Sequence, residues 1–298
     1  DLFRICYKRQ KLIATLKINH LNGDRGMHYV VCVKMVPDTT QVIIDPVTNT
    51  LIREGVPFIT NPFDNHAVEE ALRLKEKYGG HITAISMGPP AADAVLKRAL
   101  SLGVDDAVLL SDRAFGGADT LATSLVLSEA IRKLDKQDPV DIVICGKQTI
   151  DGDTAQVGPG IACRLKYSQL TLVDRIIEIH KEKRIIVARR ALEEMYEIIE
   201  SRLPVLMTVV RETNVPRYPT VPGRLDAAEV KIPIWTNDVL KLDANRIGLK
   251  GSPTQVRKIF APQREKGEIM EGEGEKMGKA VDAVFKKLLD WDFISLEN

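Results

Sequence analysis

The chain has 298 residues, which is enough for one large or two modest domains with a sizeable core. Its 42 basic and 41 acidic residues leave a net charge of +1, and only 5% of the residues are aromatic, so nothing favours nucleic acid as a partner. No apolar run approaches the roughly 18 residues that a membrane-spanning helix needs, and we expect no membrane insertion. The four cysteines lack C-x-x-C spacing, which indicates a reducing, cytoplasmic setting.

Residues 1–26 differ in character from the rest of the chain. They carry six basic and two acidic residues, with no long apolar run and no small-residue cleavage site. A compact domain is predicted to begin at Met27, because residues 28–34 have the pattern of a buried first strand. We therefore expect residues 1–26 to be an N-terminal extension outside the fold, either upstream or processed sequence, with a presequence as the alternative.

From Met27 the pattern alternates between strands and helices. A hairpin is predicted over residues 41–53, and Asn61 and Pro62 suit the N-cap and first position of a helix that ends at Gly79. This alternation predicts right-handed crossovers and a mostly parallel, doubly wound α/β sheet that forms a nucleotide-binding core. The predicted strands are 28–35, 81–87, 106–111 and 140–146, and the predicted helices are 62–78, 91–102 and 119–134.

After residue 168 the pattern predicts antiparallel strands at the edge of the sheet. They cover residues 170–179, 184–192 and 195–201, and a further buried strand is expected at 204–210. Proline frequency then rises, which predicts an extended segment over 211–233. The expected domains are therefore an α/β nucleotide-binding domain, 27–231, and a C-terminal arm for partner binding, 232–298, which closes with an amphipathic helix over 275–290.

The run from Gly146 to Pro159 is the most informative part of the chain. It comes after a short β-branched strand and precedes an apolar helical pattern, and nine of the residues from Gly146 to Gln156 are polar or glycine. Such a turn aims backbone N–H groups and a helix N-terminus at the space beyond the strand, which is a natural seat for phosphate. Its spacing is neither the Walker pattern nor G-x-G-x-x-G. An ordinary loop with Asp153 or Thr154 as helix N-cap is the alternative.

Three other unusual loops lie at carboxyl ends of predicted strands, where ligands bind in open α/β sheets. They comprise residues 34–37, 87–90 and 115–120, and with the Gly146 run they predict a single crevice. The histidines are isolated, and neither metal-ligand spacing nor a Ser/His/Asp order is present. We therefore expect no metal and no catalytic side chain, so that any chemistry comes from a bound cofactor.

These motifs together resemble the β subunit of electron-transfer flavoproteins. The resemblance rests on Val30–Lys34, Asn61–Asp64 followed by residues 67–71, Ser86–Pro89 and Gly146–Gly158. The segment Arg211–Pro219 is also similar to the signature of that family. The resemblance extends from Met27 to the C-terminus, and the motifs occur in the same order.

The resemblance implies a heterodimer with an α subunit that carries one FAD. It also implies an α/β core like that of adenine nucleotide hydrolases, and an arm that wraps the partner. In the mitochondrial branch the β subunit holds AMP as a structural nucleotide. Matching the motifs assigns the nucleotide contacts to Cys32, Asn61, Pro62, Phe63, Asp64, Met87, Thr149, Ile150, Asp151, Gly152, Asp153, Thr154, Ala155, Gln156, Val157, Gly158, Pro159 and Gly160.

Two segments, Asp151–Pro159 and Gly248–Thr254, are more similar to the electron-bifurcating branch, in which the β subunit binds a second FAD in place of AMP and NAD(H) approaches that flavin. Gly152 leaves room for the larger ligand, although a turn requirement would also explain it. The resemblance then implies that Asp153, Thr154 and Gln156 bond the ribose, pyrophosphate or flavin. The ribityl chain is assigned to Asp119, Thr120 and Thr123, with Asp119 as a simple N-cap as the alternative.

The leading hypothesis is thus an electron-carrier subunit of an NADH-dependent bifurcating oxidoreductase, paired with an α subunit and joining a larger dehydrogenase or quinone-reducing complex. No side chain is expected to act as acid or base. The second hypothesis is a non-bifurcating β subunit with structural AMP. A stand-alone ATP-binding module of the stress-protein type is the third, and the long arm with its final helix counts against it.

Overall fold

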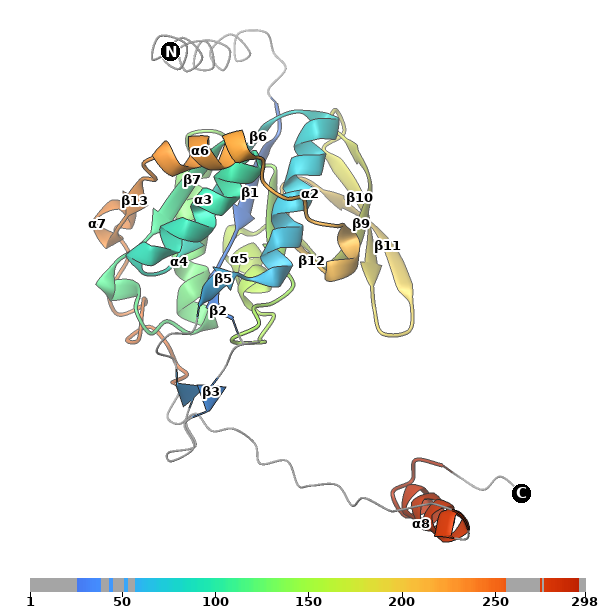
Figure 1. Cartoon of the computed structure of the whole chain (residues 1–298). Helices are drawn as coiled ribbons and strands as arrows, with labels where there is room; N and C mark the ends of the chain where they lie inside the picture. Colours follow the sequence, from blue (N-terminus) through green and yellow to red (C-terminus); the bar gives the residue numbers. More distant parts are fainter. Residues whose placement is uncertain are drawn as a thin grey trace.

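The computed structural model describes residues 26–38, 43–44, 51–52, 57–255, 274 and 276–294. Its centre is a nine-stranded sheet in the order β11-β10-β9-β12-β8-β1-β6-β7-β13 (Figure 1). Neighbouring strands from β9 to β13 run parallel, whereas β10 and β11 add antiparallel edge strands. The prediction of a mostly parallel α/β fold with antiparallel edge strands is confirmed. Apart from Gly26, the expected N-terminal extension lies outside the described residues.

The elements alternate in the predicted order. The strands are β1 (His28–Cys32), β2 (Met35–Pro37), β3 (Ile43–Ile44), β4 (Leu51–Ile52), β5 (Phe58–Thr60), β6 (His81–Met87), β7 (Asp106–Leu110), β8 (Ile142–Gly146), β9 (Ser168–His180), β10 (Ile185–Ala191), β11 (Tyr196–Arg202), β12 (Val205–Val209) and β13 (Ile234–Trp235). The α-helices are α2 (Pro62–Tyr78), α3 (Asp93–Leu102), α4 (Thr120–Asp135), α5 (Val157–Leu165), α6 (Val221–Glu229), α7 (Asn237–Leu240) and α8 (Lys276–Asp290). Short 3-10 helices are η2 (Pro90–Ala92), η3 (Arg113–Phe115) and η4 (Arg211–Thr213).

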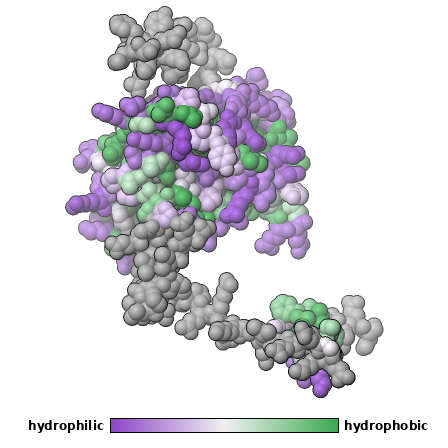
Figure 2. All heavy atoms as spheres, viewed as in Figure 1, coloured by the Kyte–Doolittle hydropathy of each residue, from purple (hydrophilic) through white to green (hydrophobic). Residues whose placement is uncertain are grey.

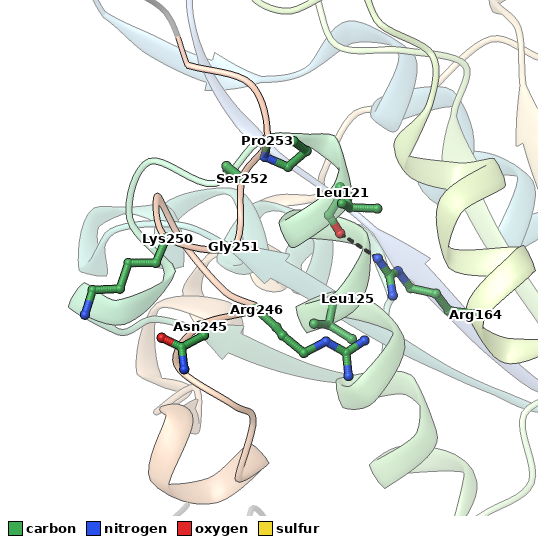
Figure 3. A pocket seen from close by; sticks show the side chains of 9 residues that line it. All are labelled: Leu121, Leu125, Arg164, Asn245, Arg246, Lys250, Gly251, Ser252 and Pro253. Atoms are coloured by element: carbon green, nitrogen blue, oxygen red, sulfur yellow. Dashed lines mark hydrogen bonds between the residues drawn. The ribbon is translucent and has the colours of Figure 1, made fainter.

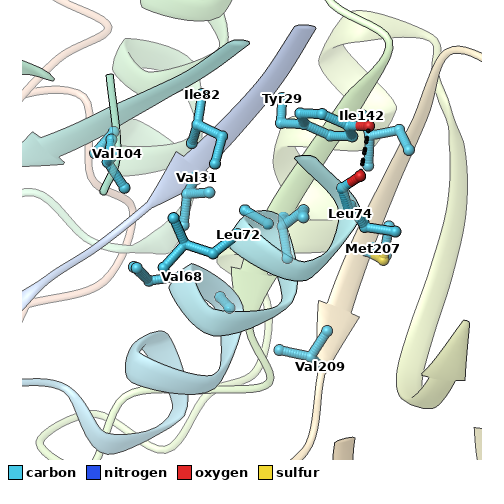
Figure 4. Close-up of a cluster of buried hydrophobic side chains, with 14 of the residues drawn as sticks. Tyr29, Val31, Val68, Leu72, Leu74, Ile82, Val104, Ile142, Met207 and Val209 are labelled. Carbon is cyan, nitrogen blue, oxygen red and sulfur yellow. Dashed lines mark hydrogen bonds between the residues drawn. The ribbon is translucent and has the colours of Figure 1, made fainter. Parts of the chain in front are cut away.

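Helices cover both faces of the sheet, so the central strands are buried on both sides. In β1, Tyr29 and Val31 pack with Leu72 of α2 on one face, where α3 also lies (Figure 4). Val30 points to the other face and packs with residues of α4 and α5, such as Val126. An unbroken apolar run is typical of such a doubly covered parallel strand.

The chain reverses its direction of winding between β1 and β8. From β1 it proceeds to β6 and β7 on one side, then crosses to β8 and β12 on the other. Residues 29–32 of β1 pair in register with residues 142–145 of β8, so both strands end at the same level. In an open parallel sheet the carboxyl ends at such a switch point border the ligand crevice.

The predicted extended segment 211–233 is in part a helix. Residues Val221–Glu229 form α6, and the Thr220 hydroxyl accepts a 3.1 Å hydrogen bond from the Gly223 amide at its start. Proline is tolerated in the first helical turn, where its missing N–H has no intrahelical partner to lose. Pro222 therefore helps to begin a helix, and the expectation that the prolines keep this segment extended was wrong.

The sheet also recruits a strand from beyond the expected domain boundary at residue 231. Ile234 and Trp235 of β13 pair in parallel with Leu109 and Leu110 of β7. Further along, Ile247 is 1% exposed and packs in the core between the sheet and α4. The α/β body therefore includes residues of the segment that was assigned to the arm.

The amphipathic helix expected near the C-terminus is present as α8. Its apolar side chains are solvent-exposed, among them Val281 at 60% and Phe285 at 45%, and Figure 2 shows apolar atoms gathered on one side of this helix. None of the described helices combines the length and the apolar composition that crossing a lipid bilayer requires.

Candidate functional site

The floor of the candidate site is a set of four residues, Lys34, Asn61, Asp64 and Gly146, and Asn61 holds it together. Asn61 is fully buried at the N-cap position of α2, yet its side chain makes no capping bond. Instead, its Nδ2 donates to Asp64 Oδ1 at 2.9 Å and to the carbonyl of residue 148 at 2.8 Å. Its Oδ1 accepts from the Ile150 amide at 3.2 Å. Asn61 therefore ties the start of α2 to the loop after β8.

Asp64 joins the ends of the two strands at the switch point. Its buried carboxylate accepts hydrogen bonds from the backbone amides of Lys34, at 2.8 Å, and of Gly146. Burial raises the pKa of Asp64 to about 7, although the hydrogen bonds from Asn61 and the two amides oppose this increase. The carboxylate is thus a structural link between β1, β8 and α2.

The rim of the site, residues 151–156, is far more open than the floor. Its residues are exposed apart from Ala155, and two side-chain bonds anchor it. The Lys34 ammonium lies 2.9 and 2.7 Å from the two carboxylate oxygens of Asp151, and Gln148 Nε2 donates to Asp153 Oδ1 at 2.7 Å. Burial opposes ionisation of Asp151, but the hydrogen bonds from Lys34 and Thr149 lower its pKa below the ordinary value.

The backbone of the rim leaves several amide donors without a hydrogen-bond acceptor. Asp153 (φ 49°) and Ala155 (φ 54°) are left-handed without being glycine, a strained conformation that clusters at ligand sites. Gln156 follows in the right-handed region, and alternation of this kind makes successive amides converge on an anion. Within the described part of the chain, the amides of residues 154–158 have no acceptor.

The alternative interpretation of this loop as an ordinary helix cap does not hold. The N-cap residue of α5 is Gln156, and no side chain caps the helix. The side chain of Asp153 bonds Gln148 instead. The first amides of α5, at Val157 and Gly158, are therefore left available to a ligand, as a phosphate site at a helix N-terminus requires.

The glycines of this region serve different purposes. A Cβ at Gly146 would lie 2.4 Å from Asp64 Oδ1, and one at Gly158 would lie 2.6 Å from Thr208 Cγ2. A Cβ at Gly160 would lie 2.9 Å from Ser124. Close packing therefore requires glycine at all three positions. A Cβ at Gly152 would meet only Thr149 Oγ1, at an ordinary 3.5 Å, and its φ is outside the left-handed region. A turn requirement therefore does not explain Gly152, and the space beside it is open.

Asp119 is the N-cap of α4. Its Oδ1 accepts from the amides of Leu121 and Ala122 at 2.9 and 3.1 Å, which confirms the capping alternative. Its Oδ2 accepts from Thr254 Oγ1 at 2.9 Å, and its amide donates to Ser252 Oγ at 2.8 Å. No hydrogen bond between described residues joins Asp119, Thr120 or Thr123 to the floor or the rim. A role for these three in holding a ribityl chain stays a prediction.

Next to this cap is a pocket of about 410 Å³. Figure 3 shows it between α4, the end of α5 and the segment 245–253. Arg164 and Arg246 contribute positive charge to its wall, whereas the side chain of Lys250 extends away from these two in Figure 3. Arg164 Nη2 donates to the carbonyl of Leu121 at 3.1 Å. The pocket suits an anionic group.

The remaining predicted residues lie at the same end of the sheet. Cys32 ends β1, Met87 ends β6, and both are half-buried. Phe63 is covered by the Arg211 guanidinium at 4.9 Å from the ring centroid. The sequence reasoning did not select Lys34 and Gln148, which hold the rim, or Ser252 and Thr254, which hold Asp119. Two features of the sequence could have identified them. Lys34 and Gln148 lie at the carboxyl ends of predicted strands, and Ser252 and Thr254 lie in the segment 248–254 that resembles the family.

The free backbone amides of the rim suit the oxygens of an anionic group such as a phosphate, and a side chain at Gly152 would meet only Thr149. Two buried hydroxyls without a hydrogen-bond partner in the described structure, those of Thr60 and Ser86, lie next in sequence to Asn61 and Met87. No group of three or more His, Cys, Asp or Glu side chains within the described ranges could hold a metal ion.

Comparison with known proteins identifies the family to which the chain is similar. Residues 48–240 match the family model described as the electron transfer flavoprotein domain. The chain is 54% identical over 248 residues to an electron transfer flavoprotein subunit beta of Thermoanaerobacterium thermosaccharolyticum, covering 83% of this chain and 93% of that protein. It is 48% identical over 265 residues to protein FixA of Azotobacter vinelandii, with 88% and 94% covered. It is also 50% identical over 242 residues to subunit CarD of a caffeyl-CoA reductase-Etf complex of Acetobacterium woodii, with 81% and 90% covered.

Proposed function

Because this chain belongs to the electron transfer flavoprotein family and is similar over most of its length to β subunits, we propose that it is the β subunit of an electron-bifurcating flavoprotein. In this proposal its site holds FAD, NADH donates electrons there, and an α subunit with its own FAD completes a cytoplasmic heterodimer. The carrying observation is the open rim, in which the amides of residues 154–158 have no acceptor among the described residues and a Cβ at Gly152 would meet only Thr149.

The roles of the chain's own residues derive from their geometry. The amides of residues 154–158 and the N-terminus of α5 would bind the pyrophosphate, because they are donors without acceptors in the described structure. Lys34 and Gln148 would orient the rim through Asp151 and Asp153. When bound, FAD would supply the redox chemistry, and the protein would position it and exclude competing reactions.

The pocket beside Asp119 supports a dinucleotide donor. Its two guanidinium groups, those of Arg164 and Arg246, suit the phosphates of NADH, since guanidinium groups bond phosphate oxygens in pairs. The segment 248–254 that forms its wall is the second stretch of sequence that resembles the bifurcating branch.

The exposed apolar face of α8 supports an obligatory partner. A face with Val281, Val284 and Phe285 each at least 45% exposed is unusual on a protein that works alone. Names of two relatives, subunit beta and a subunit of a reductase-Etf complex, describe proteins that work within assemblies. We infer an α subunit as the first partner and a larger dehydrogenase or quinone-reducing complex as a further one.

A β subunit with structural AMP is the second candidate, since the floor and rim would bind the phosphate of AMP equally well. Flavin stoichiometry distinguishes the two. We expect two FAD per heterodimer after co-expression with the α subunit, and bleaching of both flavins by NADH. One FAD together with one AMP, and no reduction by NADH, would contradict the bifurcating assignment and support the AMP form.

A further inference from the structure

Two cysteines face each other at the switch point of the sheet. Cys32 of β1 and Cys145 of β8 are register partners on neighbouring parallel strands. Such strands lie about 4.8 Å apart. Disulfides join Cα atoms that are roughly 4.4–6.8 Å apart, so the backbone spacing suits a bond. Both side chains lie on the face covered by α4 and α5.

The two thiols differ in access. Cys145 is 6% exposed, and its pKa is raised by a hydrogen bond with the Cys32 thiol, by burial and by the nearby Asp64 carboxylate. The register places the two side chains next to each other on neighbouring strands. Cys32 is half-buried and lies at the end of its strand, whereas Cys145 is buried. A small reagent therefore reaches Cys32 first.

We propose that Cys32 and Cys145 form a peroxide-sensitive pair whose disulfide weakens nucleotide binding at this site. Hydrogen peroxide oxidises the Cys32 thiol to a sulfenic acid, with one water released. The Cys145 sulfur then attacks the Cys32 sulfur, the S–S bond forms, and a second water leaves. The two thiols lose two electrons and two protons, and one peroxide is reduced to two waters.

The disulfide acts on the site through the strand ends. The amides of Lys34, two residues after Cys32, and of Gly146, directly after Cys145, both bond the Asp64 carboxylate. Cys145 also underlies the first turn of α5, because a Cβ at Gly158 would lie 3.9 Å from its Cβ. Drawing the two cysteines into covalent contact shifts the groups that set the floor and the donors of α5.

The formation of the Cys32–Cys145 disulfide is inferred from the pairing of the two strands alone. The expected loss of nucleotide affinity rests also on the proposed function of the site. The experiment treats the full-length chain, in the complex with which it is purified, with hydrogen peroxide. Intact mass and non-reducing peptide maps measure crosslinking, and calorimetry with AMP as probe measures affinity. We expect the loss of two hydrogen atoms, a Cys32–Cys145 crosslinked peptide, and AMP binding weaker by about tenfold that dithiothreitol restores.

Each variant is compared with itself before and after peroxide. Cys145→Ser and Cys145→Ala should form no crosslink and lose no AMP affinity on treatment, whereas Cys163→Ser, which changes an exposed cysteine of α5, should behave as the wild type. Oxygen added at Cys32 without a crosslink, or a crosslink through Cys163, would overturn the pair. A crosslink that leaves AMP affinity unchanged would overturn its effect on the site. Absence of AMP binding in the reduced protein would refute the nucleotide site itself. The intact mass and the peptide maps would still show whether the Cys32–Cys145 crosslink forms.

Discussion

The floor and the rim of the candidate site are adjacent in space but built on opposite principles. In the floor, Asn61 and Asp64 are buried and their side-chain atoms bond backbone or side-chain partners from three elements. In the rim, the side chains are mostly exposed, two residues adopt left-handed backbone, and several amides have no acceptor among the described residues.

From this difference we infer which residues maintain the site and which would meet a ligand. Satisfied, buried polar groups stabilise one geometry, because losing any partner leaves another group unpaired. Unpaired donors held in a strained backbone gain most when an anion arrives. Changes in the floor should therefore reduce stability, whereas changes in the rim should reduce affinity at nearly constant stability.

The largest expected effect is the pH dependence that Asp64 gives to the floor. The pKa of Asp64 rises from 3.8 to about 7 on folding, so the protonated carboxyl stabilises the folded state relative to the unfolded chain. This stabilisation is fully present below about pH 4 and is lost as the pH rises through 7. A shift of about three units corresponds to a change on the order of 4 kcal/mol. Urea unfolding of the wild type and of Asp64→Asn at pH 5 and pH 8 should show the wild type losing stability relative to the variant. A constant difference between these pH values would refute the assignment.

A smaller loss is expected from Asn61→Ala, which removes three hydrogen bonds of the floor. It leaves the Gln148 carbonyl and the Ile150 amide without their partner, and the free energy of unfolding should fall by about 3 kcal/mol. The matched control in the rim is Asp153→Asn, which keeps an acceptor for Gln148 and tolerates left-handed backbone. The control should change stability by less than about 0.5 kcal/mol. If denaturant unfolding shows that Asn61→Ala and Asp153→Asn lose the same free energy of unfolding, the distinction between floor and rim is wrong.

The smallest effect concerns affinity alone. Gly152→Asp places a carboxylate in the open space of the rim, near the expected pyrophosphate. Like charges about 4 Å apart cost around 4 kcal/mol at an effective dielectric of roughly 20, and we expect about half of that after screening. FAD retention by the purified heterodimer should fall while AMP binding persists and the melting temperature stays unchanged.

Gly152→Ala is the control for this substitution, because its Cβ makes only an ordinary contact with Thr149 and its backbone is not left-handed. It should retain flavin. If the aspartate variant keeps two flavins and is still reduced by NADH, then Gly152 does not determine which ligand binds.

The sequence predicted the alternation of strands and helices, because apolar runs bounded by turn residues are local signals. It failed where distant partners decide the structure. Asn61 is the N-cap residue of α2, as predicted, but its side chain bonds the loop after β8, 87 residues away, and does not cap the helix. Prolines indicated an extended segment, yet Pro222 begins α6 once Thr220 supplies the cap. The two-residue strand β13 has no periodicity to detect, and only its pairing with β7 defines it.

That short strand has a consequence for how the protein is made. Unpaired N–H and C=O groups along β7 would template association with other chains, and β13 covers part of this edge at Leu109 and Leu110. Synthesis runs from the N-terminus, so the ribosome releases β7 more than a hundred residues before Ile234 and Trp235 emerge. During that interval the nascent sheet has an uncovered flank. A released chain that ends before residue 234 should therefore associate with chaperones more than the full-length chain, in which β13 covers part of the flank.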